Sequence, residues 1–179
     1  MFSIARQAVP IDALLKTYRG GVRPERWGAY GDCFAVSIDR AVSLADFVFA
    51  FYTSPLFRIE RTLLRVFLKA PSTDGQARAL ADGSRSSFAV WYVGMRTATQ
   101  LLMCDRYERT RSWFRVLPLA GGRTLLQFGS AIAAAPDRTL AASAHKRFSL
   151  LLHFHLLYSQ LLLHSSKVGV ARNCTLEST

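Results

Sequence analysis

Two side chains in the C-terminal part of the sequence belong to the residue types that transfer protons. His155 and Ser159 stand four residues apart in an apolar stretch, so a helix would place them one turn apart on the same side. An imidazole beside a hydroxyl can bind a polar group of a ligand or move a proton near neutral pH. A histidine on an apolar face is more often a core residue held by one hydrogen bond. Both interpretations stay open on the sequence alone.

Asp105 is the second candidate for acid–base chemistry. It lies with Glu108 near an expected turn, where carboxylates are usually solvated. The sequence has no GxSxG, HExxH or Walker motif. His155 points away from His153 and His164 on a straight helix, so we expect no metal site. We expect no cofactor either. A proton-transfer enzyme needs little motif, so an enzyme stays an alternative.

The charge of the chain is extreme. Lys and Arg number 23 against 12 Asp and Glu, a formal net charge of +11, and all but four of the basic residues are arginine. Such a field attracts nucleic acid, anionic lipid or small anions. The arginines are spread along the chain rather than gathered in a dense tract, so we do not expect a nucleic-acid partner.

Three features predict the cellular compartment. The three cysteines lack a CxxC spacing, which favours a reducing environment. Residues 1–10 lack the apolar stretch of a secretory signal. The apolar run 148–163 is interrupted by polar residues and is shorter than the ~20 residues that a membrane span needs. We therefore expect a soluble, cytoplasmic protein.

One expected helix carries a basic stripe. Four cations recur at spacings of three and four, which places them on one face: Arg58, Arg61, Arg65 and Lys69. The stripe predicts either a contact with an anionic membrane or an ordinary solvated face, which is the commoner case. Five apolar residues lie on other faces and are expected to point toward the core: Leu56, Ile59, Leu63, Val66 and Phe67.

One expected strand alternates between two chemical characters. One face would carry Arg109, Arg111, Trp113 and Arg115, and the other Thr110, Ser112, Phe114 and Val116. The arginine–tryptophan face could stack on a base, pair with an anionic group in a cavity, form an interface, or face solvent with the tryptophan under arginine stems. The pattern leaves these alternatives open.

The remaining residues predict the elements that position these side chains. Ser43 begins one helix that ends near residue 53, and Ser54 with Pro55 begins a second that reaches about residue 69. Gly83 closes a short helix over 73–81. Strands are expected at 32–38, 88–95, 98–104, 109–117 and 123–132, with a turn at 120–122, a short helix at 11–18 and a long final helix at 140–168.

This order of elements resembles a known superfamily. The segments that carry the likeness are YGDCFAVSI, SLADFVFAFYTSPLFRIERTLL, FAVWYVGMR, LLQFGSAI and RFSLLLHFHLLYSQLLL. Together they look like the helix-grip domain of the START/Bet v 1-like superfamily, which includes polyketide cyclases and lipid-transfer proteins. The resemblance implies a cavity between sheet and terminal helix that holds an apolar or amphipathic molecule. It covers 30–168, with about five strands where the superfamily has more.

We therefore expect an α+β helix-grip fold, with a curved antiparallel sheet wrapped on a long C-terminal helix and two short helices after the first strand. The expected divisions are an irregular segment 1–29, one domain over 30–170 and a tail over 171–179. The expected function is binding of a small hydrophobic or amphipathic ligand in the cavity. One alternative is a cyclase or dehydratase, with His155 or Asp105 transferring a proton. The other is a basic protein that contacts anionic membranes or nucleic acid.

The residues expected to line the pocket are Trp91, Arg96, Arg111, Trp113, His155, Tyr158 and Ser159. Aromatic side chains would bury the ligand, and an arginine would orient an anionic group through a forked contact.

Overall fold

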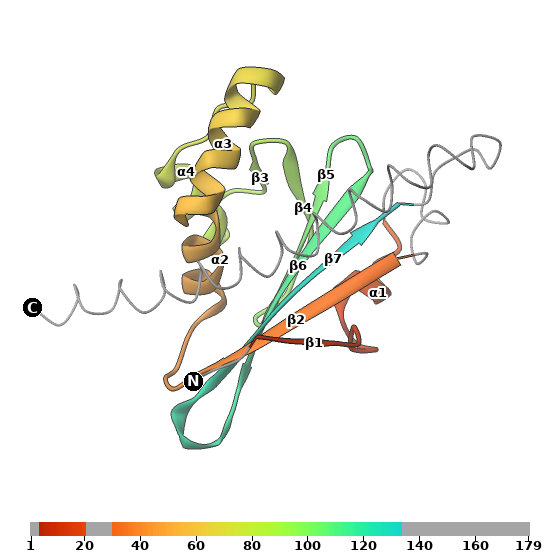
Figure 1. The fold of residues 1–179 in the computed structure, drawn as a ribbon, viewed down its shortest axis with the longest axis vertical. Helices are drawn as coiled ribbons and strands as arrows, with labels where there is room; N and C mark the ends of the chain where they lie inside the picture. The colour runs from red at the N-terminus through yellow and green to blue at the C-terminus, as the bar shows by residue number, and fades with distance from the viewer. Residues whose placement is uncertain (1–3, 21–29, 134–179) are drawn as a thin grey trace, which may run out of the picture.

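The computed structural model describes residues 4–20 and 30–133. In chain order its elements are β1 (Ala5–Gln7), α1 (Leu14–Thr17), β2 (Tyr30–Ile38), α2 (Leu44–Tyr52), α3 (Pro55–Leu68), α4 (Asp74–Asp82), β3 (Ser87–Phe88), β4 (Trp91–Arg96), β5 (Gln100–Asp105), β6 (Thr110–Pro118), the short 3-10 turn η2 (Ala120–Gly122) and β7 (Thr124–Ile132). The strands form one antiparallel sheet in the order β1-β2-β7-β6-β5-β4-β3 (Figure 1).

The three helices after β2 begin and end at residues whose side chains or backbone suit those positions. Ser43 caps α2 by accepting the backbone N–H of Asp46 at 3.0 Å. Ser54 caps α3 in the same way, and Pro55 occupies its first turn, where a missing N–H costs nothing. Gly83 ends α4 at φ 87°, a conformation that a glycine adopts without strain.

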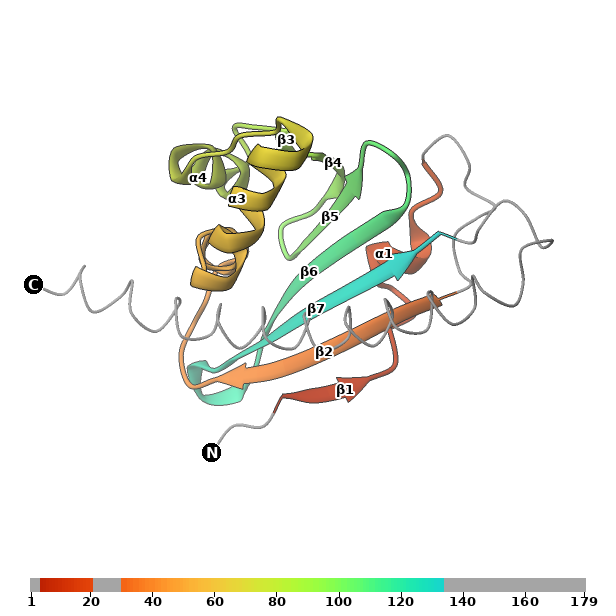
Figure 2. The same cartoon turned by 45° about the horizontal axis from the view of Figure 1, so that its top comes forward.

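One face of the sheet packs against these helices, and we call it the helix-covered face. It carries Phe34, Phe114 and Phe128, and α2 lays Phe47 and Phe51 onto it. The Phe51 ring centroid lies 4.8 Å from that of Phe114 and 4.7 Å from that of Phe128. Edge-to-face and tilted ring contacts of this kind are favourable beyond the area that they bury. Figure 2 shows α2, α3 and α4 grouped on one side of the sheet.

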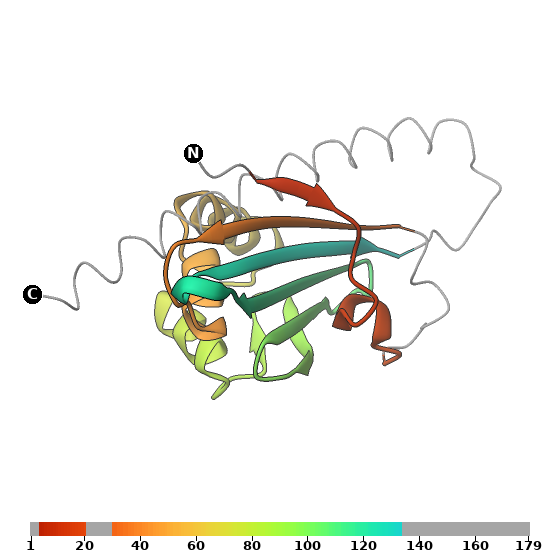
Figure 3. The same ribbon diagram turned by 90° about the horizontal axis from the view of Figure 1, so that it is seen from below.

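The opposite face of the sheet is covered by residues 9–18. Leu14 and Leu15 of α1 pack with Val9 and Tyr18 on a second apolar cluster that includes Cys33, Leu102, Cys104, Trp113 and Ala131. Figure 3 shows α1 apart from the other three helices. Gly129 lies beneath this cluster, and a Cβ there would lie 2.7 Å from the carbonyl oxygen of Asp32, 3.0 Å from Cε3 of Trp113 and 3.3 Å from Cδ2 of Leu15.

The α+β class, the antiparallel sheet and the pair of helices after β2 are confirmed. Two features differ from the prediction. The segment 1–29 contains β1, which pairs with β2, and the strand expected at 88–95 is divided between β3 and β4 around Ala89, whose φ is +51°. The final helix expected at 140–168, which a complete helix-grip arrangement needs, lies outside the described residues.

Candidate functional site

A buried carboxylate lies on the helix-covered face, at the end of the strands remote from the turn between β2 and α2. Asp32 of β2 stands opposite Ser130 of β7, which stands opposite Ser112 of β6. The side chains alternate with Phe34 and Phe128 and therefore share their face. Asp32 is 2% exposed and Ser130 is 1% exposed. The Oδ1 atom of Asp32 accepts the backbone N–H of Ser130 at 2.9 Å and its hydroxyl at 2.5 Å.

A carboxylate in an apolar wall is costly to bury unless hydrogen bonds compensate it. The two bonds from Ser130 supply part of that compensation and fix the direction of the carboxylate. Carboxylates accept hydrogen bonds from hydroxyl and amine groups. A buried carboxylate–serine pair at an apolar surface is the kind of polar group that orients such a donor.

Sequence reasoning missed Asp32 and Ser130, although a signal for the first exists. The period-two pattern of β2 places Asp32 on the same side as Phe34 and Val36. A carboxylate at an otherwise apolar position of a strand needs a hydrogen-bonding partner, and that partner comes from β7, almost a hundred residues away in the sequence. The sequence shows the inward carboxylate but not its partner.

Asp105, the predicted acid–base residue, also points to the helix-covered face. Its Oδ1 atom accepts the backbone N–H of Arg109 at 2.9 Å, and its Oδ2 atom accepts the hydroxyl of Thr110 at 3.2 Å. Its carbonyl oxygen accepts the N–H of Glu108 at 3.0 Å. These three bonds close the turn between β5 and β6. Its part in proton transfer stays a prediction.

Two of the predicted ligand-binding residues lie on this same face. Trp91 joins the aromatic cluster, with its ring centroid 5.8 Å from that of Phe57. The guanidinium of Arg96 donates to the carbonyl oxygen of Leu80 at 2.8 Å and to that of Ala81. Arg96 therefore interacts with the C-terminal end of α4, where a cation is favourable.

Arg111 and Trp113 lie on the opposite face of the sheet, beneath residues 9–20. Trp113 is fully buried there. The two Nη atoms of Arg111 donate to the carbonyl oxygens of Tyr18 and Gly20, at 3.4 and 2.8 Å. The sheet thus separates these two residues from Trp91 and Arg96, and the four do not line one chamber. The described contacts of Arg111 and Trp113 attach the N-terminal segment to the sheet.

The predicted residues His155, Tyr158 and Ser159 lie outside the described residues. Their proximity to Asp32 or Asp105 stays a prediction.

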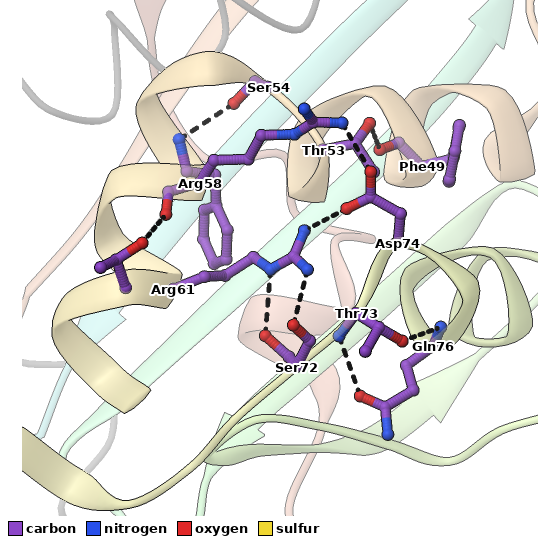
Figure 4. A network of polar contacts seen from close by, with 11 residues as sticks. Phe49, Thr53, Ser54, Arg58, Arg61, Ser72, Thr73, Asp74 and Gln76 are labelled. Atoms are coloured by element: carbon purple, nitrogen blue, oxygen red, sulfur yellow. Dashed lines mark hydrogen bonds and ion pairs between the residues drawn. The ribbon is translucent and has the colours of Figure 1, made fainter. Parts of the chain in front are cut away.

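A second polar cluster connects α3 to the start of α4 (Figure 4). Asp74 accepts Arg58 through Oδ2 and Arg61 through Oδ1, both at 2.5 Å. Arg61 also donates from Nε to the hydroxyl of Ser72 at 3.1 Å and from Nη2 to its carbonyl oxygen at 2.6 Å. With Thr62 and Arg65, these residues surround a surface hollow of about 270 Å³. Three guanidinium groups face one carboxylate there, so the hollow favours anions.

Glu60 of α3 is a further titratable group that the sequence did not single out. Its Oε2 atom is buried and accepts no hydrogen bond from the described residues. Burial raises the pKa of Glu60 to about 7, because the charged form loses its hydration.

Within 4–20 and 30–133, no three His, Cys, Asp or Glu side chains gather into a group that could hold a metal ion. Over those same ranges, no helix has both the length and the apolar character needed to cross a bilayer.

Comparison with known proteins gives one weak likeness. No protein-family model matches the chain, and no curated protein matches it in sequence. A similar solved structure is that of CalU16 from Micromonospora echinospora, at 12% identity and a TM-score of 0.33, with 100% of this chain and 99% of that chain covered. A likeness at this level supports no conclusion about fold or function.

Proposed function

We propose that the protein binds a small hydrophobic or amphipathic molecule between the helix-covered face of the sheet and the C-terminal residues 140–168. The observation that carries the proposal is the buried Asp32–Ser130 pair in a face lined mostly by aromatic and aliphatic side chains. Apolar walls with few convergent polar groups are typical of small-molecule sites. The apolar side chains would supply about 25 cal/mol for each Å² of apolar ligand surface removed from water.

The chemistry of this face also narrows the class of ligand. The sequence suggests an arginine that orients an anionic group, but Arg111 lies on the opposite face and Arg96 interacts with α4. The carboxylate of Asp32 would instead accept a hydrogen bond and repel an anion. The proposed ligand is therefore an apolar molecule with a hydroxyl or amine donor near Asp32.

A cyclase or dehydratase is the alternative function for the same face. The observation that favours it is the short contact of 2.5 Å between the Ser130 hydroxyl and Oδ1 of Asp32, which holds a carboxylate in a defined position as a general base requires. His155 or Asp105 would then be the second proton-transfer group. In that case His155→Ala abolishes turnover, whereas a binding protein with this substitution keeps most of its affinity.

Native mass spectrometry of the purified protein tests the proposal, followed by denaturing extraction of any retained molecule. We expect a stoichiometric apolar compound in the wild-type protein and its loss in Asp32→Asn. Asp39→Asn is the matched control, because Asp39 is exposed just after β2, and it should retain the compound. A thermal melt of each variant separates loss of ligand from loss of fold.

Titration with Nile red, a neutral apolar dye, provides a second measurement. An empty wild-type protein that also fails to bind the dye contradicts the proposal. Equal retention in Asp32→Asn and Asp39→Asn would show that the Asp32–Ser130 pair is not part of the site.

A further inference from the structure

The helix α3 carries an apolar stripe that the described residues leave uncovered. Ile59 is 62% exposed, Leu63 52%, Val66 62% and Phe67 75%. We call these four residues the apolar ridge. The sequence predicts that they point toward the core, and this prediction is wrong in the structure. The physical reason is that Phe57, in the first turn of α3, is buried against α2 and the sheet, whereas the later turns project away from them (Figure 1).

The ridge stands out against the rest of the surface. The described part of the chain exposes seven large hydrophobic side chains, and four of them form this ridge. Their spacing of three and four residues makes one continuous stripe along the helix. A contiguous apolar stripe with polar residues beside it indicates a contact surface rather than scattered exposure.

Cations occupy a separate, polar face of the same helix. Arg58 and Arg65 are exposed, and Lys69 follows directly after the last turn. Asp74 pairs with Arg58 and Arg61, and Ser72 also bonds Arg61 (Figure 4). These residues line the hollow of about 270 Å³. Among the described residues that line the hollow, Asp74 is the only acidic one, so the net charge of the hollow is positive.

We propose that α3 docks on an anionic lipid bilayer. The apolar ridge enters the boundary between headgroups and acyl chains, and the arginines of the cationic face pair with lipid phosphates. A helix with a strongly separated apolar face and a cationic face is suited to lie in the plane of a bilayer. The formal net charge of +11 attracts the protein to such a surface over a longer range.

The chemistry favours a bilayer over a nucleic acid. A nucleic-acid surface would be recognised by the cations alone and would leave Leu63 and Phe67 in water. A bilayer would contact both the apolar ridge and the cations of α3. The proposal does not rest on the ligand-binding function, because the ridge belongs to α3 and not to the face that carries Asp32.

Co-sedimentation with lipid vesicles tests the proposal on the full chain. Vesicles of phosphatidylcholine alone are compared with vesicles that also contain phosphatidylglycerol. We expect binding to the anionic vesicles to be at least about tenfold stronger, and to weaken as salt is raised. The double substitution Leu63→Ser/Phe67→Ser should abolish binding at low salt, and Arg65→Glu should reduce it strongly.

Two matched controls change the same chemistry elsewhere. Arg123→Glu reverses a charge on the exposed turn before β7, and Ile11→Ser removes the apolar side chain that is 87% exposed in the N-terminal segment. Both should bind the vesicles like the wild type. Equal losses in Arg65→Glu and Arg123→Glu would show binding by net charge alone and overturn the proposal.

Measurements without lipid test whether something other than a bilayer contacts α3. A large fall in melting temperature for Leu63→Ser/Phe67→Ser would show that the chain itself, through residues 134–179, covers the ridge. A change from dimer to monomer, measured by light scattering, would assign it to a second copy. Binding of soluble glycerol phosphate without any vesicle binding would assign the arginines to a free anion. Each of these results overturns docking on a bilayer.

Discussion

Trp113 donates its indole N–H to Oε1 of Gln100 at 2.8 Å, on the face of the sheet that residues 9–20 cover. The same oxygen accepts the backbone N–H of Leu14, the first residue of α1, at 3.1 Å. One amide on β5 therefore satisfies a buried side chain of β6 and an otherwise unpaired N–H at the start of a helix. This shared acceptor connects the N-terminal segment to the middle of the sheet.

Gln100→Met should therefore destabilise the protein. The substitution leaves two buried donors, the Trp113 indole and the Leu14 amide, without their acceptor, at about 1–3 kcal/mol each. We expect a lower urea midpoint and faster amide exchange at Leu14. Gln127→Met is the matched control, because Oε1 of buried Gln127 accepts no hydrogen bond from the residues that the structure describes. A cost for Gln100→Met no larger than that for Gln127→Met would contradict the role of the shared acceptor.

Two glycine substitutions should change stability in opposite directions. Gly129→Ala places a Cβ 2.7 Å from a backbone oxygen and 3.0 Å from the Trp113 ring, neither of which can move away easily. We expect a loss of about 1–3 kcal/mol or more. Gly75→Ala lies in α4, where the nearest atom would be 3.8 Å away, and should add about 0.4–1 kcal/mol. Chemical denaturation measures both, and a stable Gly129→Ala would show that the Asp32 carbonyl oxygen and the Trp113 ring lie less close to residue 129 than the structure indicates.

Glu60 should make stability depend on pH. Burial raises its pKa from 4.5 to about 7 in the folded protein. Between these values the folded chain holds a proton that the unfolded chain has lost, so the free energy of unfolding falls as pH rises from about 4.5 to 7. Over this pH range the free energy of unfolding falls by at most about 3 kcal/mol.

Glu60→Gln removes this titration while keeping the shape of the side chain. Denaturation of both proteins over pH 4.5 to 8 provides the measurement. We expect the variant to be more stable than the wild type above pH 7. Between pH 4.5 and 7 its stability should not show the decrease that Glu60 causes in the wild type. An unchanged fall in the variant would assign the pH dependence to another group.

Local signals in the sequence predict most of the fold. Ser43, Ser54 and Gly83 mark helix ends through bonds or backbone conformations that involve only neighbouring residues, and the structure confirms all three. β1 escapes prediction because three residues show no periodicity. It is a strand only because it pairs with residues 33–35 of β2.

The candidate site shows where sequence reasoning fails. The alternation of side chains along β6 predicts that Arg111 and Trp113 lie on the opposite face of the sheet from Phe114, and the structure confirms this. It cannot show which segment covers each face, because that depends on contacts between residues about ninety apart, such as Leu14 with Gln100. The pairing of Asp32 with Ser130 escapes prediction for the same reason, since the two residues lie 98 apart in the sequence.

The pairing of β2 with β7 also has a consequence for the order of folding. Strands β4 to β7 follow one another as a meander of short turns, whereas β2 and β7 join residues 30–38 to residues 124–132. Closing so long a loop costs chain entropy before any contact compensates for it. We therefore expect the meander to form early, with β2 and the N-terminal segment docking late onto β7 as a template.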